Sequence, residues 1–498
     1  MELQFNKHDI DCLRTVADRQ ISQELTQEVR LLDGMPDIGR ILGCWGQTVI
    51  RGKEWRGDEM SASGGVMAWV LYEPEDGSAP QILETWMPFQ AKWDLQDAEH
   101  DGTMILRPAL SCMDCRSTSA RKIMLRCCLD LAAEGVEAMK LSLYQPDQVP
   151  EDVQLLQRTY PMEIPKEAGE KAFEIEDSWN ISGLSDPQVR IVYYQVNPVL
   201  TEHKVMADKL VFRGNCLCNL LYIDGNGNLK SETTEFPVSQ FVELSDTYGN
   251  HASATVDLLL TGMEIEKNET GTPEIKCGLA AQYKIFDREM ITVVEDGYST
   301  TRAADIENAM LQVPVRLDVR KDQIPYRHQI HANANRLVDT AVYWGNPAVQ
   351  RTADGAEIVL DCFANVLYMD EEDRLSGTQS QWSDSRALSA DDNTKVCARL
   401  TPEHHVALQD PEGAALSANM QMEVSVFSLQ SIPMVIGMTL GEPQLKDEQR
   451  PSVILRKLGD KRIWELAKEH RTTVEAIEMA NSITEQPDAE SILLIPVP

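Results

Sequence analysis

Four residues with oxygen-bearing side chains have the spacing of a calcium-binding loop. Positions 1, 3, 5 and 12 of the EF-hand template are filled by Asp224, Asn226, Asn228 and Glu235. The template also requires a glycine at position 6, where this chain has Leu229, and a helix on either side. The residues before Asp224 alternate as a strand does, and the run Asp-Gly-Asn-Gly tolerates positive φ. The sequence therefore predicts a β-hairpin rather than a metal site, with a calcium loop as the alternative.

Other residues of the kind that carry chemistry stand in settings that predict structure. Cys112 and Cys115 form a CxxC pair, but no second pair or histidine cluster at zinc spacing lies nearby, so we interpret them as thiols in a turn. His404 and His405 lie in a polar stretch that we interpret as a loop, with a metal role as the alternative. No nucleophile elbow, phosphate loop, HExxH or dinucleotide fingerprint occurs. We therefore predict no enzyme activity, no metal site and no cofactor.

The charge and the apolar runs restrict the partners and the location. Acidic residues outnumber basic residues by 79 to 46, which gives a net charge of -33. Such a chain repels phosphate groups, so we expect no nucleic acid partner. The sequence has no signal-peptide run near its start and nowhere 18 consecutive apolar residues. We expect a protein that is not secreted or inserted in a membrane, and eleven cysteines that stay reduced.

An alternating run that ends in a Leu-Tyr step occurs three times, at Tyr72, Tyr222 and Tyr368. Small or apolar residues lie two, four and six positions before each tyrosine, which predicts one buried face of a strand. Only the second copy has the full calcium spacing, which further favours a hairpin. The predicted fold class is mainly β, with a helical arm (residues 1–36, the helix from about 6 to 33) before three β-rich, sandwich-like domains that contain short helices. These domains are expected at residues 37–165, 166–320 and 321–440.

A different pattern follows the polar stretch 441–451, which we interpret as a linker. Ile463, Leu466 and Ala467 are spaced as one face of a helix. Thr472 and Glu475 have the spacing of a capping box at the start of a second helix. Because apolar strands bracket the two helices, residues 452–498 are predicted to form a small β-α-α-β module.

The motifs of this module and of the repeats resemble two known families. The module resembles a LysM domain through Gly459-Asp460, the run WELA at 464–467, the run TTV at 472–474, Asn481, and the run LIP at 494–496. The repeats resemble SPOCS domains through the Leu-Tyr turn and the run GYST at 297–300. SPOCS domains followed by one LysM domain are the architecture of SipL-like and SpoVID-like spore coat morphogenetic proteins.

This resemblance implies a function in endospore formation. It implies a non-enzymatic adaptor in the mother-cell cytoplasm that recruits coat proteins to the forespore surface, with the LysM domain docking onto the coat basement-layer ATPase. The alternative is binding of peptidoglycan or another N-acetylglucosamine polymer, as LysM domains generally do. Against the alternative, Lys461-Arg462 stands where a small hydroxyl residue is usual, and the glycine that commonly precedes the last strand is absent.

The candidate binding residues therefore lie in the tail of the chain. Lys461 and Arg462, with Arg456 and Lys457 upstream, form a basic cluster on an acidic protein, which is suited to steering an acidic partner. Trp464 is either an anchor beside this cluster or part of the module's core. The full candidate set for partner or glycan binding is Gly459, Asp460, Lys461, Arg462, Trp464, Lys468, Arg471 and Asn481.

Overall fold

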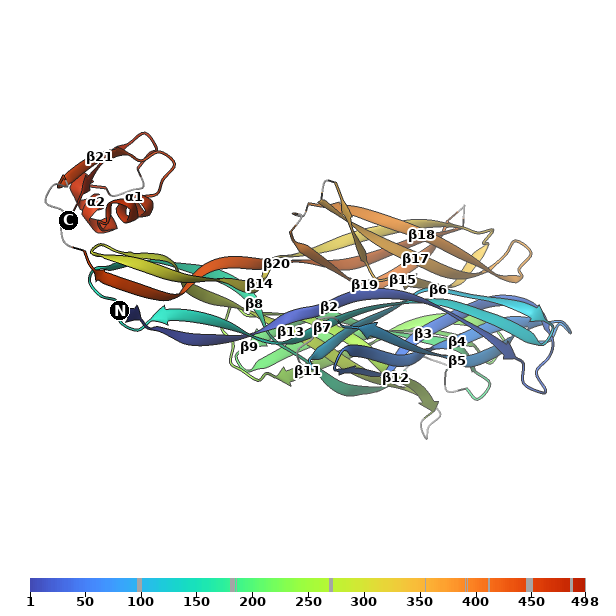
Figure 1. Cartoon of the computed structure of the whole chain (residues 1–498). Helices are drawn as coiled ribbons and strands as arrows, with labels where there is room; N and C mark the ends of the chain where they lie inside the picture. Colours follow the sequence, from blue (N-terminus) through green and yellow to red (C-terminus); the bar gives the residue numbers. More distant parts are fainter. Residues whose placement is uncertain are drawn as a thin grey trace.

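The computed structural model describes the chain except residues 96–100, 180–183, 185, 268–271, 354, 390, 392, 411–412, 445–450, 484–486 and 498, and the side chains of residues 267 and 402–405. An elongated β-rich body (residues 1–444) carries a small module near one end, here called the tail (residues 451–497; Figure 1). The mainly β fold class is confirmed. The described residues hold two helices, α1 (Ile463–His470) and α2 (Val474–Asn481), both in the tail. Neither helix has the length and apolar character needed to cross a bilayer.

The described part of the body forms three units with one plan. In each unit the long first strand, the last strand and the one before it make an outer sheet, and the strands between them make a second sheet. Unit one contains β2 (Phe5–Arg30), β3 (Ile38–Arg56), β4 (Glu59–Pro74), β5 (Gln81–Asp94), β6 (Thr103–Ser119) and β7 (Lys122–Pro146). Unit two contains β8 (Val153–Ser178), β9 (Arg190–Met206), β10 (Lys209–Ile223), β11 (Leu229–Glu243), β12 (Ser253–Lys267) and β13 (Pro273–Ser299).

Unit three repeats the plan with one extra strand. It contains β14 (Arg302–His331), β15 (Arg336–Trp344), β16 (Ala348–Thr352), β17 (Gly355–Met369), β18 (Leu375–Leu388), β19 (Lys395–Asp410) and β20 (Gly413–Pro443). The short strand β1 (Glu2–Leu3) pairs with β20, which joins the two ends of the body. In unit two a hydrophobic core fills the space between the two sheets, with members that include Phe212, Cys218, Cys277 and Leu279. The short helices expected inside the repeats are therefore wrong for the described residues, since antiparallel strands with short connections form the units.

The predicted helical arm is also wrong. Residues 5–30 form β2, which pairs along its length with β7, from Phe5 opposite Pro146 to Arg30 opposite Lys122. Ile21, Leu25 and Val29 are spaced four apart, which places them on one face of a helix and equally on one face of a strand. Pairing with β7 decides between the two. Units two and three also begin with long strands, β8 and β14. The predicted boundaries at 165/166 and 320/321 therefore fall inside these strands.

The three Leu-Tyr runs are the central strands of the second sheets. They are β4, β10 and β17, and each turns back into the next strand as a hairpin. The predicted buried face is confirmed in all three: its members are Val66, Ala68, Val70, Cys216, Cys218, Leu220, Cys362, Ala364 and Val366. Opposite-face residues such as Trp69 and Leu71 are buried too, because the units pack against one another.

The paired ends of the three outer sheets pack together as a stem. The pairs are β2 with β7, β8 with β13, and β14 with β20. A shared apolar core runs between them and takes residues from all three units: Cys12, Leu141, Leu143, Met162, Ile164, Ile291, Val293, Leu311, Val313, Val315, Ile432 and Met434. At the tip, Leu3, Val153, Met438 and Leu440 close this core. Because they share this core, the three units form one body rather than three independent domains.

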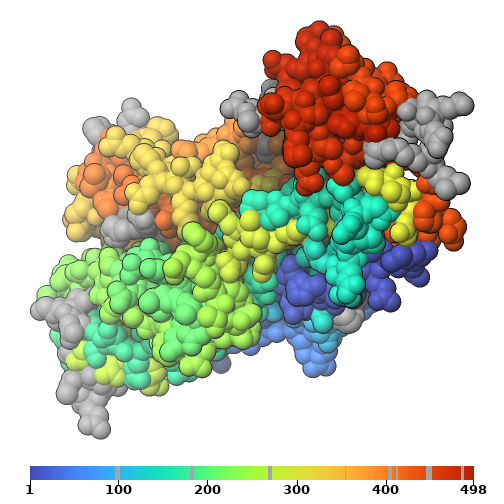
Figure 2. All heavy atoms as spheres, turned by 90° about the vertical axis from the view of Figure 1, so that its left-hand side faces the viewer, coloured from blue at the N-terminus to red at the C-terminus, as the bar shows by residue number. Residues whose placement is uncertain are grey.

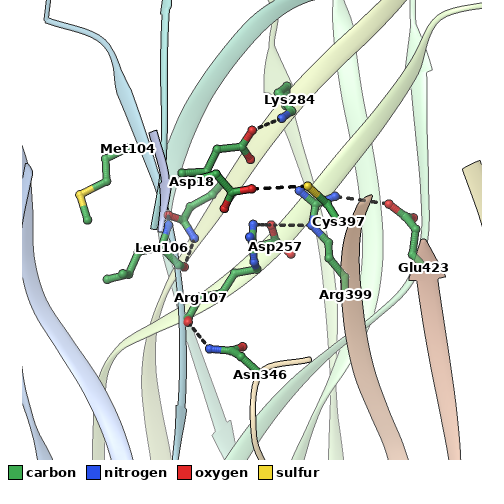
Figure 3. Close-up of polar contacts among 12 residues, drawn as sticks. Asp18, Met104, Leu106, Arg107, Asp257, Lys284, Asn346, Cys397, Arg399 and Glu423 are labelled. Carbon is green, nitrogen blue, oxygen red and sulfur yellow. Dashed lines mark hydrogen bonds and ion pairs between the residues drawn. The ribbon is translucent and has the colours of Figure 1, made fainter. Parts of the chain in front are cut away.

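Ion pairs join the units, and the pair between Lys284 and Glu134 is buried (Figure 3). Lys284 of unit two lies 2.5 Å from Glu134 of unit one, and the two side chains are 4% and 7% exposed. These residues occupy matching places, because Leu141 and Leu143 follow Glu134 at seven and nine positions as Ile291 and Val293 follow Lys284.

Two further ion pairs close a ring around the three units. Arg399 of unit three lies 3.4 Å from Asp257 of unit two. Lys395 of unit three lies 2.8 Å from Asp18 of unit one. Burial would raise the pKa of Glu134, but the charges of Lys284 and the nearby arginines outweigh it and hold that pKa well below its ordinary value. Each unit is thus tied to both others by charge.

The substitution Lys284→Met should strongly destabilise the body, because it leaves the Glu134 carboxylate buried without its partner. Breaking a buried pair on one side costs about 3–5 kcal/mol. The melting temperature in calorimetry measures this, with Lys122→Met as the control, since Lys122 belongs to an exposed pair with Glu28. The double variant Glu134→Leu/Lys284→Met should recover much of the loss. Equal melting temperatures for Lys284→Met and Lys122→Met would contradict the structural role of the pair.

Candidate interaction site in the tail

The tail folds in the order β21 (Val453–Lys457), α1, α2 and β22 (Ile492–Pro496), with β21 and β22 paired. Its core consists of Leu458, Leu466, Ala467, Ile477, Leu493 and Ile495. This is the predicted order of elements. One detail of the prediction is wrong: the N-cap of α2 is Thr473, whose side chain accepts a hydrogen bond from the N–H of Ala476 at 3.0 Å. Thr472 is buried instead.

The predicted turn before α1 is open to solvent. Gly459 has a φ of +60°, a left-handed conformation that side chains rarely adopt, and no atom comes within 4 Å of the place where its Cβ would be. Its N–H donates to the carbonyl of Ala489 at 2.8 Å, which ties the turn to the segment before β22. Asp460 is exposed at the end of the turn.

The basic cluster lies on the outside of the tail. Lys461 and Arg462 are exposed and pair with carboxylates of α1, Lys461 with Glu469 at 2.6 Å and Arg462 with Glu465 at 3.3 Å. Upstream, Lys457 pairs with Glu490 at 2.5 Å. Exposed pairs of this kind are weak, so a partner's carboxylates can replace them at little cost.

Asn481 has a structural role inside the tail. Its amide nitrogen donates to the carbonyls of Ile477 and Leu494, at 2.8 and 2.7 Å, and its oxygen accepts from the N–H of Leu494 at 2.7 Å. The two hydrogen bonds with Leu494 hold β22 against α2. These hydrogen bonds, here called the Asn481 bracket, account for an asparagine at this position without a ligand.

The remaining candidates contact the body, although Lys468 stays partly exposed. The indole N–H of Trp464 donates to Asp296 at 2.8 Å, and the ammonium of Lys468 lies 2.6 Å from the same carboxylate. Trp464 also packs against the tail core, so it joins the tail to the body. Arg471 ends α1 in a left-handed conformation and donates to Gln444, the last described residue of the body. Figure 2 shows the tail (red) resting on the teal and yellow strands at this end of the body.

Sequence reasoning missed the two residues of the body that receive α1, Asp296 and Tyr298. Tyr298 is 5% exposed, its ring meets that of Trp464 edge-on with 4.9 Å between centroids, and its hydroxyl donates to the carbonyl of Thr472 at 2.7 Å. Burial acts to raise the pKa of Asp296, but hydrogen bonds from Lys468 and Trp464 outweigh it and lower that pKa. Both residues lie in or beside the GYST run at 297–300. In the sequence this run indicated only a resemblance to SPOCS domains and not a contact with the tail.

The calcium spacing at Asp224 belongs to a hairpin, as predicted. Strands β10 and β11 pair from Ile223 opposite Leu229, and Asp224 accepts hydrogen bonds from the N–H groups of Asn226 and Asn228, each at 2.9 Å. The backbone hydrogen bond from Asn228 leads the contacts that lower the pKa of Asp224 to about 2. Glu235 lies six pairs along the ladder from the turn, so it does not join Asp224.

The cysteine and histidine candidates also lie in strands. Cys112 and Cys115 are in β6, so the predicted turn is wrong, and residues three apart in a strand point to opposite faces and do not share a ligand. His404 and His405 fall within β19, and their side chains lie outside the described residues. Within the described part of the chain, no three His, Cys, Asp or Glu side chains are grouped as metal ligands.

Asn481→Ala should loosen the tail without changing the body, because it leaves the backbone N–H and C=O of Leu494 without partners. Such a loss costs about 1–3 kcal/mol, so the amides of residues 492–495 in the full chain should exchange about tenfold faster or more. Hydrogen exchange followed by mass spectrometry measures this, with the exposed Glu475→Gln on the same helix as control. Unchanged exchange in Asn481→Ala would refute the bracket.

Comparison with known proteins adds one match. No curated protein and no solved structure matches the chain. Residues 189–267, which span β9 to β12 of unit two, match the family model described as SipL, SPOCS domain. This part of the chain is therefore similar to the SPOCS domain of SipL.

Proposed function

We propose that the chain is a non-enzymatic adaptor of spore formation that recruits coat proteins at the forespore surface from the mother-cell cytoplasm. The match of residues 189–267 to the SPOCS domain of SipL carries this proposal. The match lies in unit two, and units one and three share its strand order. A body with three like units in fixed positions offers several places for coat proteins at once, and such multivalency raises avidity.

In this proposal the tail is a LysM domain that docks onto the coat basement-layer ATPase. The support comes from the outward surface of the tail. The basic cluster is exposed there, and the outer face of the β21–β22 sheet carries exposed apolar residues, with Leu455 67% and Ile492 68% exposed. Apolar residues beside charges are the composition of a protein interface with a central anchor and a polar rim.

Binding of an N-acetylglucosamine polymer is the second candidate function. The open space over Gly459 favours it, since a sugar could approach the backbone of that turn. The neighbouring Lys461 and Arg462 place two positive charges beside the same turn, and Asn481 is occupied inside the tail. Protein docking is therefore the stronger of the two.

The two candidates make opposite predictions for a pull-down with purified proteins. Full-length protein should capture the basement-layer ATPase, and a chain ending at Gln449 should not. In the full-length protein, Lys461→Glu/Arg462→Glu should lower the affinity about tenfold or more, because charge complementarity is lost, and salt should weaken the wild-type complex. Insoluble peptidoglycan should retain neither form.

A matched control distinguishes an effect of the tail surface from an effect of the change in net charge. Lys122→Glu/Arg126→Glu makes the same change in charge on exposed residues of unit one and should leave the affinity unchanged. Equal capture of the ATPase by the full-length and shortened chains would refute docking through the tail. Retention on peptidoglycan that the shortened chain lacks would favour the second candidate.

A further inference from the structure

A single carboxylate of the body receives two side chains of α1. Trp464 and Lys468 are four residues apart and so lie on one side of the helix, one turn above the other. Asp296 at the end of β13 contacts both, at 2.8 Å from the indole nitrogen and 2.6 Å from the ammonium. A hydrogen bond to a charged acceptor is stronger than a neutral one, so this carboxylate is a specific receptor for a Trp-x-x-x-Lys face.

Tyr298 completes the receptor with an apolar contact. Its side chain is counted among the buried core residues of the tail, although it belongs to unit two. The hydroxyl donates to the carbonyl of Thr472, just beyond the end of α1, and the ring lies edge-on against Trp464. A tyrosine at the end of a stem strand would be a large exposed aromatic without the tail, so the surface is suited to being covered.

The backbone of the stem aims these two side chains at the tail. The pairing of β13 with β8 shifts register between Val294 and Asp296, and a bulge of this kind redirects the side chains that follow. Asp296 and Tyr298 are two apart and share a face. Between them, a Cβ at Gly297 would lie 2.6 Å from the end of the Met438 side chain, so a larger residue here would force that side chain of unit three to shift.

The contacts are few, and the tether compensates for that. They include one partly exposed ion pair, two hydrogen bonds and one aromatic edge contact, which together make a small interface. Only the segment between Gln444 and Pro451 separates the tail from the body. A short tether gives an effective concentration in the millimolar range, so a weak interface can be filled most of the time and still open.

From these observations we propose that Asp296, Gly297 and Tyr298 form a docking site for the protein's own tail, and that a partner of the tail must compete with this site for the Trp464 and Lys468 face of α1. The identity of the partner rests on the proposed function, whereas the docking does not. Lys461 and Arg462 stay exposed in the docked state, so a partner can first meet the basic cluster. The apparent affinity of the partner then equals its affinity for the free tail multiplied by the fraction of molecules in which the tail is free.

Lysine acylation of the full chain tests the docking without any partner. With an excess of an N-hydroxysuccinimide ester, Lys468 should react several-fold faster in Tyr298→Ala and in Asp296→Asn than in the wild type, because its ion pair or its cover is lost. Lys457 and Lys461 are exposed and pair with carboxylates of the tail itself, so they should react at unchanged rates. Asp305→Asn, an exposed carboxylate on β14, is the control. Equal rates for Lys468 in all variants would overturn the docking site.

Binding of the purified basement-layer ATPase tests the competition. Tyr298→Ala and Asp296→Asn should bind it several-fold more tightly than the wild type, with Asp305→Asn unchanged. If truncation at Gln449 abolishes binding but the two variants bind like the wild type, the competition is wrong and the proposed function stands. If no form binds the ATPase, the proposed function and the competition fall together, and the acylation rates alone decide whether the docking site exists.

Discussion

The buried ion pair between Lys284 and Glu134 is the constraint on which the rest of the body depends. Each partner lies in the central strand of an outer sheet, and with the Arg399–Asp257 and Lys395–Asp18 pairs it links three units in a ring. A rotation of unit one against unit two would leave the charge of Lys284 or Glu134 buried and unpaired, which is far costlier than losing an apolar contact. The ring thereby fixes how the three pairs of strands enter the stem, and the stem fixes where β13 presents Asp296 and Tyr298 to the tail.

Local patterns in the sequence were sufficient for the hairpins and the tail. The period-two runs before Tyr72, Tyr222 and Tyr368 each became a central strand with the predicted face buried, since a turn and a half-buried strand are specified by neighbours in sequence. The helical arm failed because Ile21, Leu25 and Val29 satisfy both periods. Their state is decided by β7, whose paired residues lie about a hundred positions away, and pairing at that distance leaves no local signal.

In the candidate site, too, local features could be predicted from the sequence and contacts between distant residues could not. Gly459, Lys461 and Arg462 could be predicted because a left-handed turn and a basic cluster are properties of short segments. The contact of Trp464 with Asp296 joins residues 168 positions apart, and no local pattern in either segment predicts this pairing. The GYST run marked the place, but a motif without its geometry could not say that Tyr298 covers the tryptophan of the tail.

Together these features describe a protein whose tail is held against the body by the Trp464 and Lys468 face of α1. The most direct test is zero-length carbodiimide cross-linking of the full-length protein, because this reagent joins a carboxylate to an amine only when the two are in contact. The docked tail should give an Asp296–Lys468 cross-link, identified by mass spectrometry, that disappears when the proposed partner, the coat basement-layer ATPase, is bound. A free chain without this cross-link, or a complex that keeps it, would contradict the account.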